Sequence, residues 1–128
     1  MRFISRRFHA MLDYITGLLL IISPWLFNFN NITDARWIAI IVGVLMLGMS
    51  FMTDYEGDGK KAISMSAHLT MDVIVGLFLA LSPWLFNFNE YVYLPHLIIG
   101  LMEIAAGLFT ERVSQHTHTI DHGISHAQ

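Results

Sequence analysis

Two histidine–aspartate pairs hold the groups of this chain that could do chemistry in an apolar environment. His9 and Asp13 stand four residues apart, and His68 and Asp72 repeat that spacing. Residues at i and i+4 share one face of a helix, so each pair presents an imidazole and a carboxylate to the same neighbour. Glu103 is the fifth member of the set that we consider. Ionisable groups are costly inside a membrane, and by default they are candidates for function.

Three interpretations of this set are open. The pairs could be structural, because buried polar networks fix how helices rotate against one another. Two histidines with two or three carboxylates also suit a divalent first-row ion such as zinc, iron or manganese. The His-xxx-Asp spacing is compatible with one ion but, unlike the HExxH pattern, is not diagnostic. In the third interpretation the histidines, aspartates and glutamate move protons or ions as a relay.

The two pairs occupy the same place in two copies of one sequence unit. Residues 23–30 return unchanged as residues 82–89, 59 positions later, and the His–Asp pairs are separated by the same offset. Over the 18 residues that end with this motif, 13 positions are identical. The second half of the unit aligns less well, with Thr53 and Thr110 57 positions apart. Two copies of one unit in a short chain predict a fold made of two equivalent halves.

The composition is that of a membrane protein. Hydrophobic residues make up 55% of the chain and charged residues 13%, against about 25% charged in ordinary globular proteins. The chain has no cysteine, which excludes disulfides and thiolate metal sites. Four apolar stretches hold roughly 17–20 residues each, which is enough to cross a bilayer. They span residues 9–27, 37–53, 67–86 and 94–110.

The basic residues predict the orientation in the membrane. Six of the seven lie on one side of the spans, and the two connections on the other side carry only Arg36 between them; the six are Arg2, Arg6, Arg7, Lys60, Lys61 and Arg112. Positive charge on short loops stays inside, so both termini and the loop over residues 54–67 are expected in the cytoplasm. Each repeat is then a hairpin of two spans, and the two hairpins enter the membrane in the same direction. We predict an all-α, polytopic four-helix bundle of two parallel repeats, with a pseudo-two-fold axis along the membrane normal.

The repeated Ser-Pro-Trp motif predicts a break in the first helix of each hairpin. Proline interrupts a helix unless it stands at the first position, and serine is a good N-cap, so the motif could end one helix and start a short one. The aromatic residues around it suit the outer headgroup level of a bilayer. A substrate pocket lined by these aromatics is the alternative. The motif residues are Ser23, Pro24, Trp25 and Asn28, with their copies Ser82, Pro83, Trp84 and Asn87.

A doubled Ser-Pro-Trp, placed in the first helix of each of two membrane hairpins, resembles the SPW-repeat integral membrane proteins of bacteria. The resemblance covers roughly residues 8–112, and it implies a multi-pass protein of the bacterial inner membrane. It transfers no catalytic residues to this chain.

We divide the chain into a transmembrane domain over residues 1–112, with repeats at about 9–54 and 68–111, and a polar cytoplasmic tail over residues 113–128. The tail is rich in histidine. If it is helical, His118, His122 and His126 share one face and could bind a metal, although Gly123 weakens a helix there. A polar tail that binds nothing is the alternative.

The glycines predict how the helices pack. Gly17 and Gly76 continue the faces of the His–Asp pairs, and small residues allow close approach of membrane helices. We expect them to bring the first and third helices together, so that the two pairs meet and act as one unit with Glu103. Ala39 and Gly43 form a small-xxx-small step that could mediate a homo-oligomer, and Gly48, Gly100 and Gly107 extend such faces.

The sequence has no nucleophile–base arrangement, phosphate loop or nucleotide fingerprint, so an enzyme is not favoured and no nucleic-acid partner is expected. We predict a small integral membrane protein, in contact with the lipid bilayer, of the binding, scaffold or ion- and proton-transport type. Its centre would be the His/Asp/Glu cluster. The alternative is a membrane-embedded metal-binding protein or metalloenzyme that uses both His-xxx-Asp pairs and a divalent transition metal.

Overall fold

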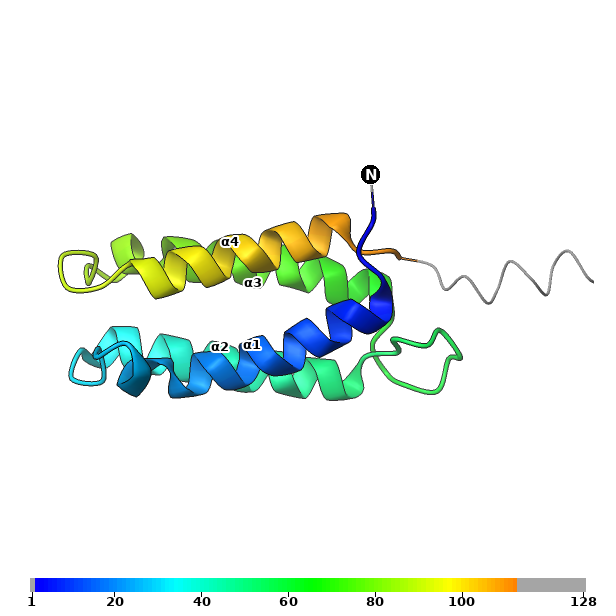
Figure 1. The fold of residues 1–128 in the computed structure, drawn as a ribbon, viewed down its shortest axis with the longest axis horizontal. Coiled ribbons are helices and arrows are strands. Elements are labelled where there is room, and N and C mark those ends of the chain that lie inside the picture. Colours follow the sequence, from blue (N-terminus) through cyan, green and yellow to red (C-terminus); the bar gives the residue numbers. More distant parts are fainter. Residues whose placement is uncertain (1, 113–128) are drawn as a thin grey trace, which may run out of the picture.

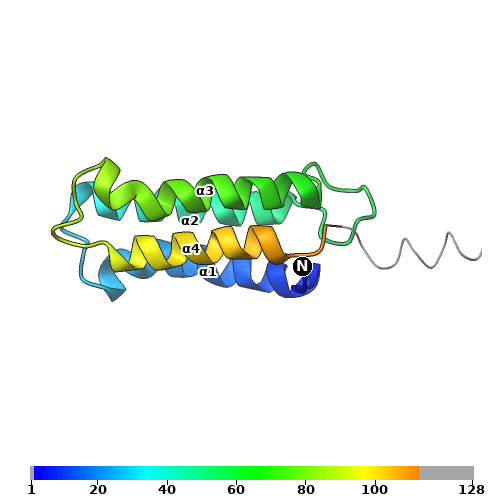
Figure 2. The same cartoon turned by 90° about the horizontal axis from the view of Figure 1, so that it is seen from above.

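The computed structural model describes residues 2–112, which form four helices and, within that range, no strand. The helices are α1 (Arg6–Leu26), α2 (Thr33–Met52), α3 (Met65–Leu85) and α4 (Leu94–Phe109). The α1–α2 and α3–α4 hairpins lie side by side along the long axis (Figure 1). The view turned by 90° places α3 over α2 and α4 over α1 (Figure 2). The predicted all-α four-helix bundle is confirmed, and the two-fold relation between its hairpins stays a prediction.

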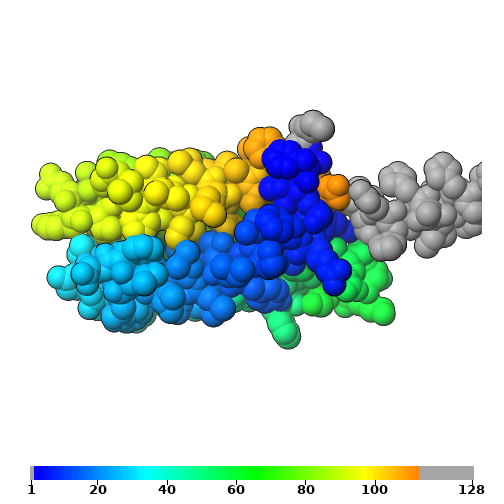
Figure 3. All heavy atoms as spheres, viewed as in Figure 1, coloured from blue at the N-terminus to red at the C-terminus, as the bar shows by residue number. Residues whose placement is uncertain are grey.

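The bundle has two different ends. The loop end, on the right in Figure 1, carries the N-terminal segment, the connection from α2 to α3 and the last residues of α4. The turn end carries the short connection within each hairpin. In the space-filling view the N-terminal segment crosses the loop end from α1 toward α4 (Figure 3). There the N–H of Ile4 donates to the carbonyl of Phe109 at 3.0 Å.

Serine caps begin α1 and α3 at equivalent positions of the repeat. Ser5 Oγ accepts the N–H of Phe8, and Ser64 Oγ accepts the N–H of Ala67, both at 3.2 Å. Such caps satisfy N–H groups that have no partner inside the helix. Because a capped first turn need not be apolar, each helix begins a few residues ahead of its apolar stretch.

The Ser-Pro-Trp motif does not start a new helix. We expected Ser23 to cap a short helix at Pro24, but α1 continues through both residues. Proline has no N–H for the carbonyl four residues earlier, which is that of Leu20. The Ser23 hydroxyl donates to this carbonyl at 2.7 Å, and Ser82 makes the same bond in α3. The N-cap expectation is therefore wrong, because serine supplies the donor that proline lacks and the helix remains intact.

Each first helix ends within the repeated motif, two residues before its asparagine. Asn28 and Asn87 have φ angles of 60° and 57°, the left-handed conformation that commonly terminates helices. The N–H of Phe29 then donates to the carbonyl of Pro24 at 2.8 Å, and the Phe29 side chain is buried. Phe88 repeats the arrangement in the second hairpin. The repeated motif is thus a helix stop that inserts one phenylalanine from each hairpin into the core.

Glycines bring the two helices of each hairpin into close contact. A Cβ added to Gly43 would lie 2.7 Å from the carbonyl oxygen of Gly17, and one added to Gly76 would lie 2.7 Å from that of Gly100. The expectation that Gly17 and Gly76 draw α1 and α3 together is therefore wrong, because the hairpin partners occupy these faces. Gly43 is also buried inside its hairpin and cannot form an oligomer contact, whereas a Cβ on Gly48 meets nothing within 4 Å. A homo-oligomer stays a prediction.

The outside of the bundle is apolar. Leu18, Leu45, Ile74 and Leu101, one from each helix, are each more than half exposed. By length and composition, α1, α2 and α3 can each cross a membrane. Helix α4 is also apolar but has only 16 residues, which at about 1.5 Å per residue is shorter than a hydrocarbon core. The chain is a multi-pass membrane protein, with a fourth helix shorter than we expected for a full span.

Candidate metal centre

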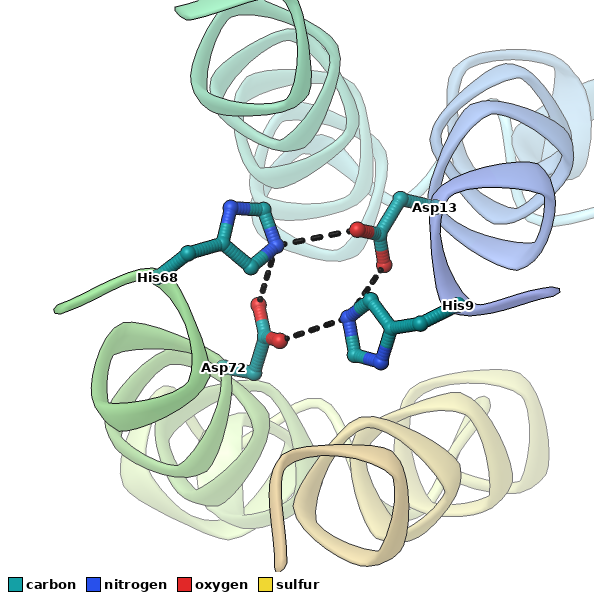
Figure 4. Close-up of side chains that lie close together, drawn as sticks. All are labelled: His9, Asp13, His68 and Asp72. Carbon is teal, nitrogen blue, oxygen red and sulfur yellow. Dashed lines mark ion pairs between the residues drawn. The ribbon is translucent and has the colours of Figure 1, made fainter. Parts of the chain in front are cut away.

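Four side chains from α1 and α3 meet inside the loop end of the bundle, and we call them the His–Asp centre (Figure 4). His9 Nε2 lies 3.1 Å from Asp13 Oδ1 and 2.9 Å from Asp72 Oδ2. His68 Nε2 lies 2.9 Å from Asp13 Oδ2 and 3.3 Å from Asp72 Oδ1. All four residues are buried. Each carboxylate therefore gives one oxygen to each imidazole, and the four groups close a ring.

The ring of four side chains lies between two diagonally opposite helices of the bundle. Viewed along the helices, α1 and α3 stand opposite each other, and the four side chains lie between them (Figure 4). The backbones of opposite helices do not touch here, so side chains must occupy the space between them. Each histidine stands on the first turn of its helix, where the N–H of His9 bonds to Ser5 and that of His68 to Ser64, both at 3.0 Å. The serine caps thus set the centre at the loop end.

Two threonines fix which nitrogen of each imidazole carries hydrogen. His9 Nδ1 lies 2.8 Å from Thr110 Oγ1, and His68 Nδ1 lies 2.6 Å from Thr53 Oγ1. Each threonine hydroxyl already donates, at 2.6 Å, to the carbonyl four residues earlier in its own chain segment, which for Thr110 is that of Ala106. The threonine oxygen can then only accept, so each Nδ1 is the donor. Each Nε2 is left to face the carboxylates.

Each Nε2 atom faces two carboxylate oxygens without a well-directed hydrogen bond to either of them. Neither His9 Nε2 nor His68 Nε2 makes a hydrogen bond of acceptable geometry, and Asp72 Oδ2 is also without one. When an imidazole is neutral with hydrogen on Nδ1, its Nε2 is an acceptor. Two such acceptors and two carboxylates then face each other in a buried space, with two negative charges in all. This arrangement requires positive charge between the groups, either as two protons or as one divalent cation.

The donor set fits a divalent transition ion. One ligand atom from each of the four residues can be chosen so that all lie within 4.8 Å of one another. Imidazole nitrogen with carboxylate oxygen is a ligand combination that zinc and other first-row ions accept. Metal-binding histidines also usually donate their second ring N–H to a nearby oxygen, which fixes the ring orientation. Thr53 and Thr110 occupy that supporting position.

Tyr55 covers the centre from the connection between α2 and α3. Its hydroxyl donates to Asp13 Oδ2 at 2.6 Å, and its ring meets the His68 ring edge-on, with centroids 5.4 Å apart. Burial and then the adjacent Asp13 carboxylate raise the pKa of Tyr55, so its hydroxyl stays a donor.

Glu103 lies apart from these four residues. It is buried on α4, and its Cβ is 3.0 Å from the position that a Cβ on Gly76 would take. Gly76 is one turn beyond Asp72 on α3, so Glu103 lies about one turn deeper in the bundle. The structure brings together four of the five residues singled out from the sequence. That Glu103 acts with them stays a prediction.

The remaining predicted site residues lie elsewhere. The Ser-Pro-Trp motifs stand at the turn end, far from the centre along the helices; their serines and prolines are buried, whereas Trp25 and Trp84 are exposed. His118, His122 and His126 fall outside the described residues.

Sequence reasoning missed four residues with polar contacts in the interior. Thr53 and Thr110 were visible only as related ends of the second helices, and Tyr55 stands in a loop with no pattern to mark it. His96 was overlooked within an apolar stretch. It is buried at the turn end between two phenylalanine rings, and its Nε2–H donates to the carbonyl of Ala35 at 3.0 Å.

A family model described as the SPW repeat domain matches residues 7–110, a range that contains both His–Asp pairs and both supporting threonines. No curated protein and no solved structure matches the chain.

Proposed function

The chain belongs to the SPW repeat family, and from this premise we propose that it is a small integral membrane protein that binds one divalent first-row transition ion at the His–Asp centre. One observation carries the proposal. Both Nε2 atoms are buried and lie 2.9–3.3 Å from oxygens of two carboxylates, while both Nδ1–H groups are held by threonines. We place the protein in the bacterial inner membrane with the loop end in the cytoplasm.

The ligand types favour particular ions. Two imidazoles and two carboxylates are borderline and hard ligands, which suit zinc, iron or manganese better than copper(I), an ion that prefers sulfur. A divalent ion also cancels the two negative charges of the aspartates, so the loaded centre is neutral in a low-dielectric interior. Among these ions zinc fits a closed set of four protein ligands best.

The closed ligand set favours binding over catalysis. Catalytic zinc sites keep one position open for water or substrate, whereas sites with four protein ligands are typically structural. Here four side chains, a tyrosine and two threonines surround the point where the ion would lie. We therefore propose that the ion is held or handed on rather than used to transform a substrate.

A ring of two imidazolium ions and two carboxylates is the competing explanation, because it is equally neutral. Elemental analysis of detergent-purified protein distinguishes the two. We expect about one transition ion per chain in the native protein and in a form that ends at residue 112. Asp13→Asn and Asp72→Asn keep the shape of the centre but remove charge, and they should lose the ion. Glu90→Gln is the control, since it neutralises an exposed carboxyl in the connection between α3 and α4, at the other end of the bundle.

Two outcomes would contradict the proposal. One is native protein that holds no transition ion after growth and purification without chelators. The other is an ion that both asparagine variants retain and that disappears only when residues 113–128 are removed, because that result would assign it to the histidine-rich tail.

A further inference from the structure

A cavity opens at the loop end, directly outside the His–Asp centre. Its volume is about 870 Å³, and it lies between the start of α1 and the connection from α2 to α3. The lining contains both acidic and basic side chains. Because the charges are mixed, the cavity has no strong preference for one sign of ion. It is better suited to be a passage than a binding site.

Tyr55 stands between this cavity and the centre. It lines the cavity, and the same side chain donates its hydroxyl to Asp13 Oδ2 at 2.6 Å and packs against His68. Thr53 also touches both spaces, but it is fully buried and its hydroxyl is bonded within its helix end. Tyr55 is only partly buried and lies beyond the last turn of α2. It is the side chain that can move without unwinding a helix.

The connection that carries Tyr55 is anchored at its base. The N–H of Asp54 donates to the carbonyl of Ile63 at 2.8 Å, and the N–H of Ile63 donates to Met52 at 3.0 Å. The Asp54 carboxylate accepts N–H groups of the loop tip, with the closest, from Gly59, at 2.8 Å. The backbone around Tyr55 is therefore held in place, and rotation of its side chain breaks the bond to Asp13 and the edge contact with His68 but unwinds no helix.

Among the described residues, the way to the centre from the turn end is filled. The four helices enclose its sides, and buried apolar side chains occupy the bundle toward the turn end, among them Leu20, Leu79, Phe29 and Phe88. The histidines lie on the first turn of their helices, so the loop end is the shortest way out.

We propose that Tyr55 gates the His–Asp centre: a divalent cation enters and leaves through the cavity at the loop end when the tyrosine hydroxyl releases Asp13. This inference rests on the proposed function. In the closed state the hydroxyl and the packed ring cover the centre. In the open state the side chain turns into the cavity, which has room for it.

The test compares exchange rates with affinity in Tyr55→Phe and Tyr55→Ala. The probe is Zn²⁺. Release is measured by stopped-flow mixing of loaded protein with an excess of a colorimetric chelator, and loading is measured by mixing unloaded protein with Zn²⁺. Tyr55→Ala should speed both loading and release roughly 10–100-fold, the range to which a hydrogen bond to a charged group corresponds. Faster loading is the decisive readout, because loss of the supporting bond to Asp13 by itself weakens affinity and speeds release but does not speed loading. The exchange rates of Tyr55→Phe should lie between those of the native protein and those of Tyr55→Ala. Tyr91→Ala, which changes an exposed tyrosine at the turn end, is the control.

The outcomes separate the gate from the site. If the native protein and the variants bind one ion but exchange it at the same rate, the gate is wrong and the metal centre stands. If Tyr55→Ala speeds release without speeding loading, the tyrosine supports the bound ion and does not gate it. Native protein that binds no Zn²⁺ at the centre overturns both proposals.

Discussion

Replacing Thr110 with valine tests whether the His–Asp centre depends on the contacts that orient its imidazoles. Valine keeps the shape of threonine but removes the oxygen that accepts the Nδ1–H of His9 at 2.8 Å. That N–H is buried, and leaving it without a partner should cost about 1–3 kcal/mol of folding free energy. Loss of such a supporting contact typically weakens metal binding about 10–100-fold. Both effects should therefore appear in one variant.

Two further variants make the test specific. Thr53→Val removes the equivalent contact to His68, and Thr70→Val is the matched control, because Thr70 also bonds to the carbonyl four residues earlier but is exposed. Affinity is measured by competition with a chelator and stability by thermal unfolding in detergent. Thr110→Val and Thr53→Val should bind more weakly and unfold at lower temperature, and Thr70→Val should do neither. Lower stability with unchanged affinity in both buried variants would refute the link between the Nδ1 contacts and the metal.

Three other predictions follow from the packing and the loop. His9→Ala and His68→Ala should each lower the free energy of unfolding in detergent. The double variant should lose less than the sum of the two single losses, by about 0.5–3 kcal/mol, because both histidines contact the same carboxylates. Additive losses would speak against a shared ring. Gly43→Leu should destabilise the α1–α2 hairpin severely, whereas Gly48→Leu should change the free energy of unfolding by less than about 0.5 kcal/mol, as thermal unfolding will show. Backbone N–H groups hold the pKa of Asp54 below its ordinary 3.8. The stability that the Asp54 carboxylate gives to the loop is therefore complete above pH 3.8 and is lost as the pH falls through the lower pKa of the folded protein. Amide chemical shifts of the loop should follow this loss, and Asp54→Asn should show the same shifts at neutral pH.

Much of the centre follows from the sequence. The spacing of His9 and Asp13 places both on one helix face, and the 59-residue offset puts the second pair at the same depth in the other hairpin. In a small bundle, polar groups at equal depth have few other partners, because the alternative is to face lipid. The sequence therefore indicates which residues meet and at which end of the bundle.

Which helices pack directly against each other could not be predicted. We assigned Gly17 and Gly76 to a contact between the first and third helices, yet each packs against its own hairpin partner. A stripe of small residues indicates that a helix has a close neighbour but not which one, and here chain connectivity decides. The two His–Asp pairs consequently meet between α1 and α3, which stand diagonally opposite each other, and side chains fill the space between these helices. The serine of the Ser-Pro motif was misjudged for a similar reason: its hydroxyl can cap a following helix or bond backward, and only the three-dimensional course of the chain selects the second.

The contacts around the centre cross between the two copies of the repeat. His9 from the first copy is oriented by Thr110 from the second, and His68 from the second is oriented by Thr53 from the first. Neither copy alone can therefore complete its own imidazole environment, so the centre requires that two copies meet. Tyr55 departs from this exchange, since the position 57 residues later is Arg112. The His–Asp centre thus takes its four side chains equally from both copies, whereas the side chain that covers it comes from one copy alone, in keeping with the single route of access that we propose.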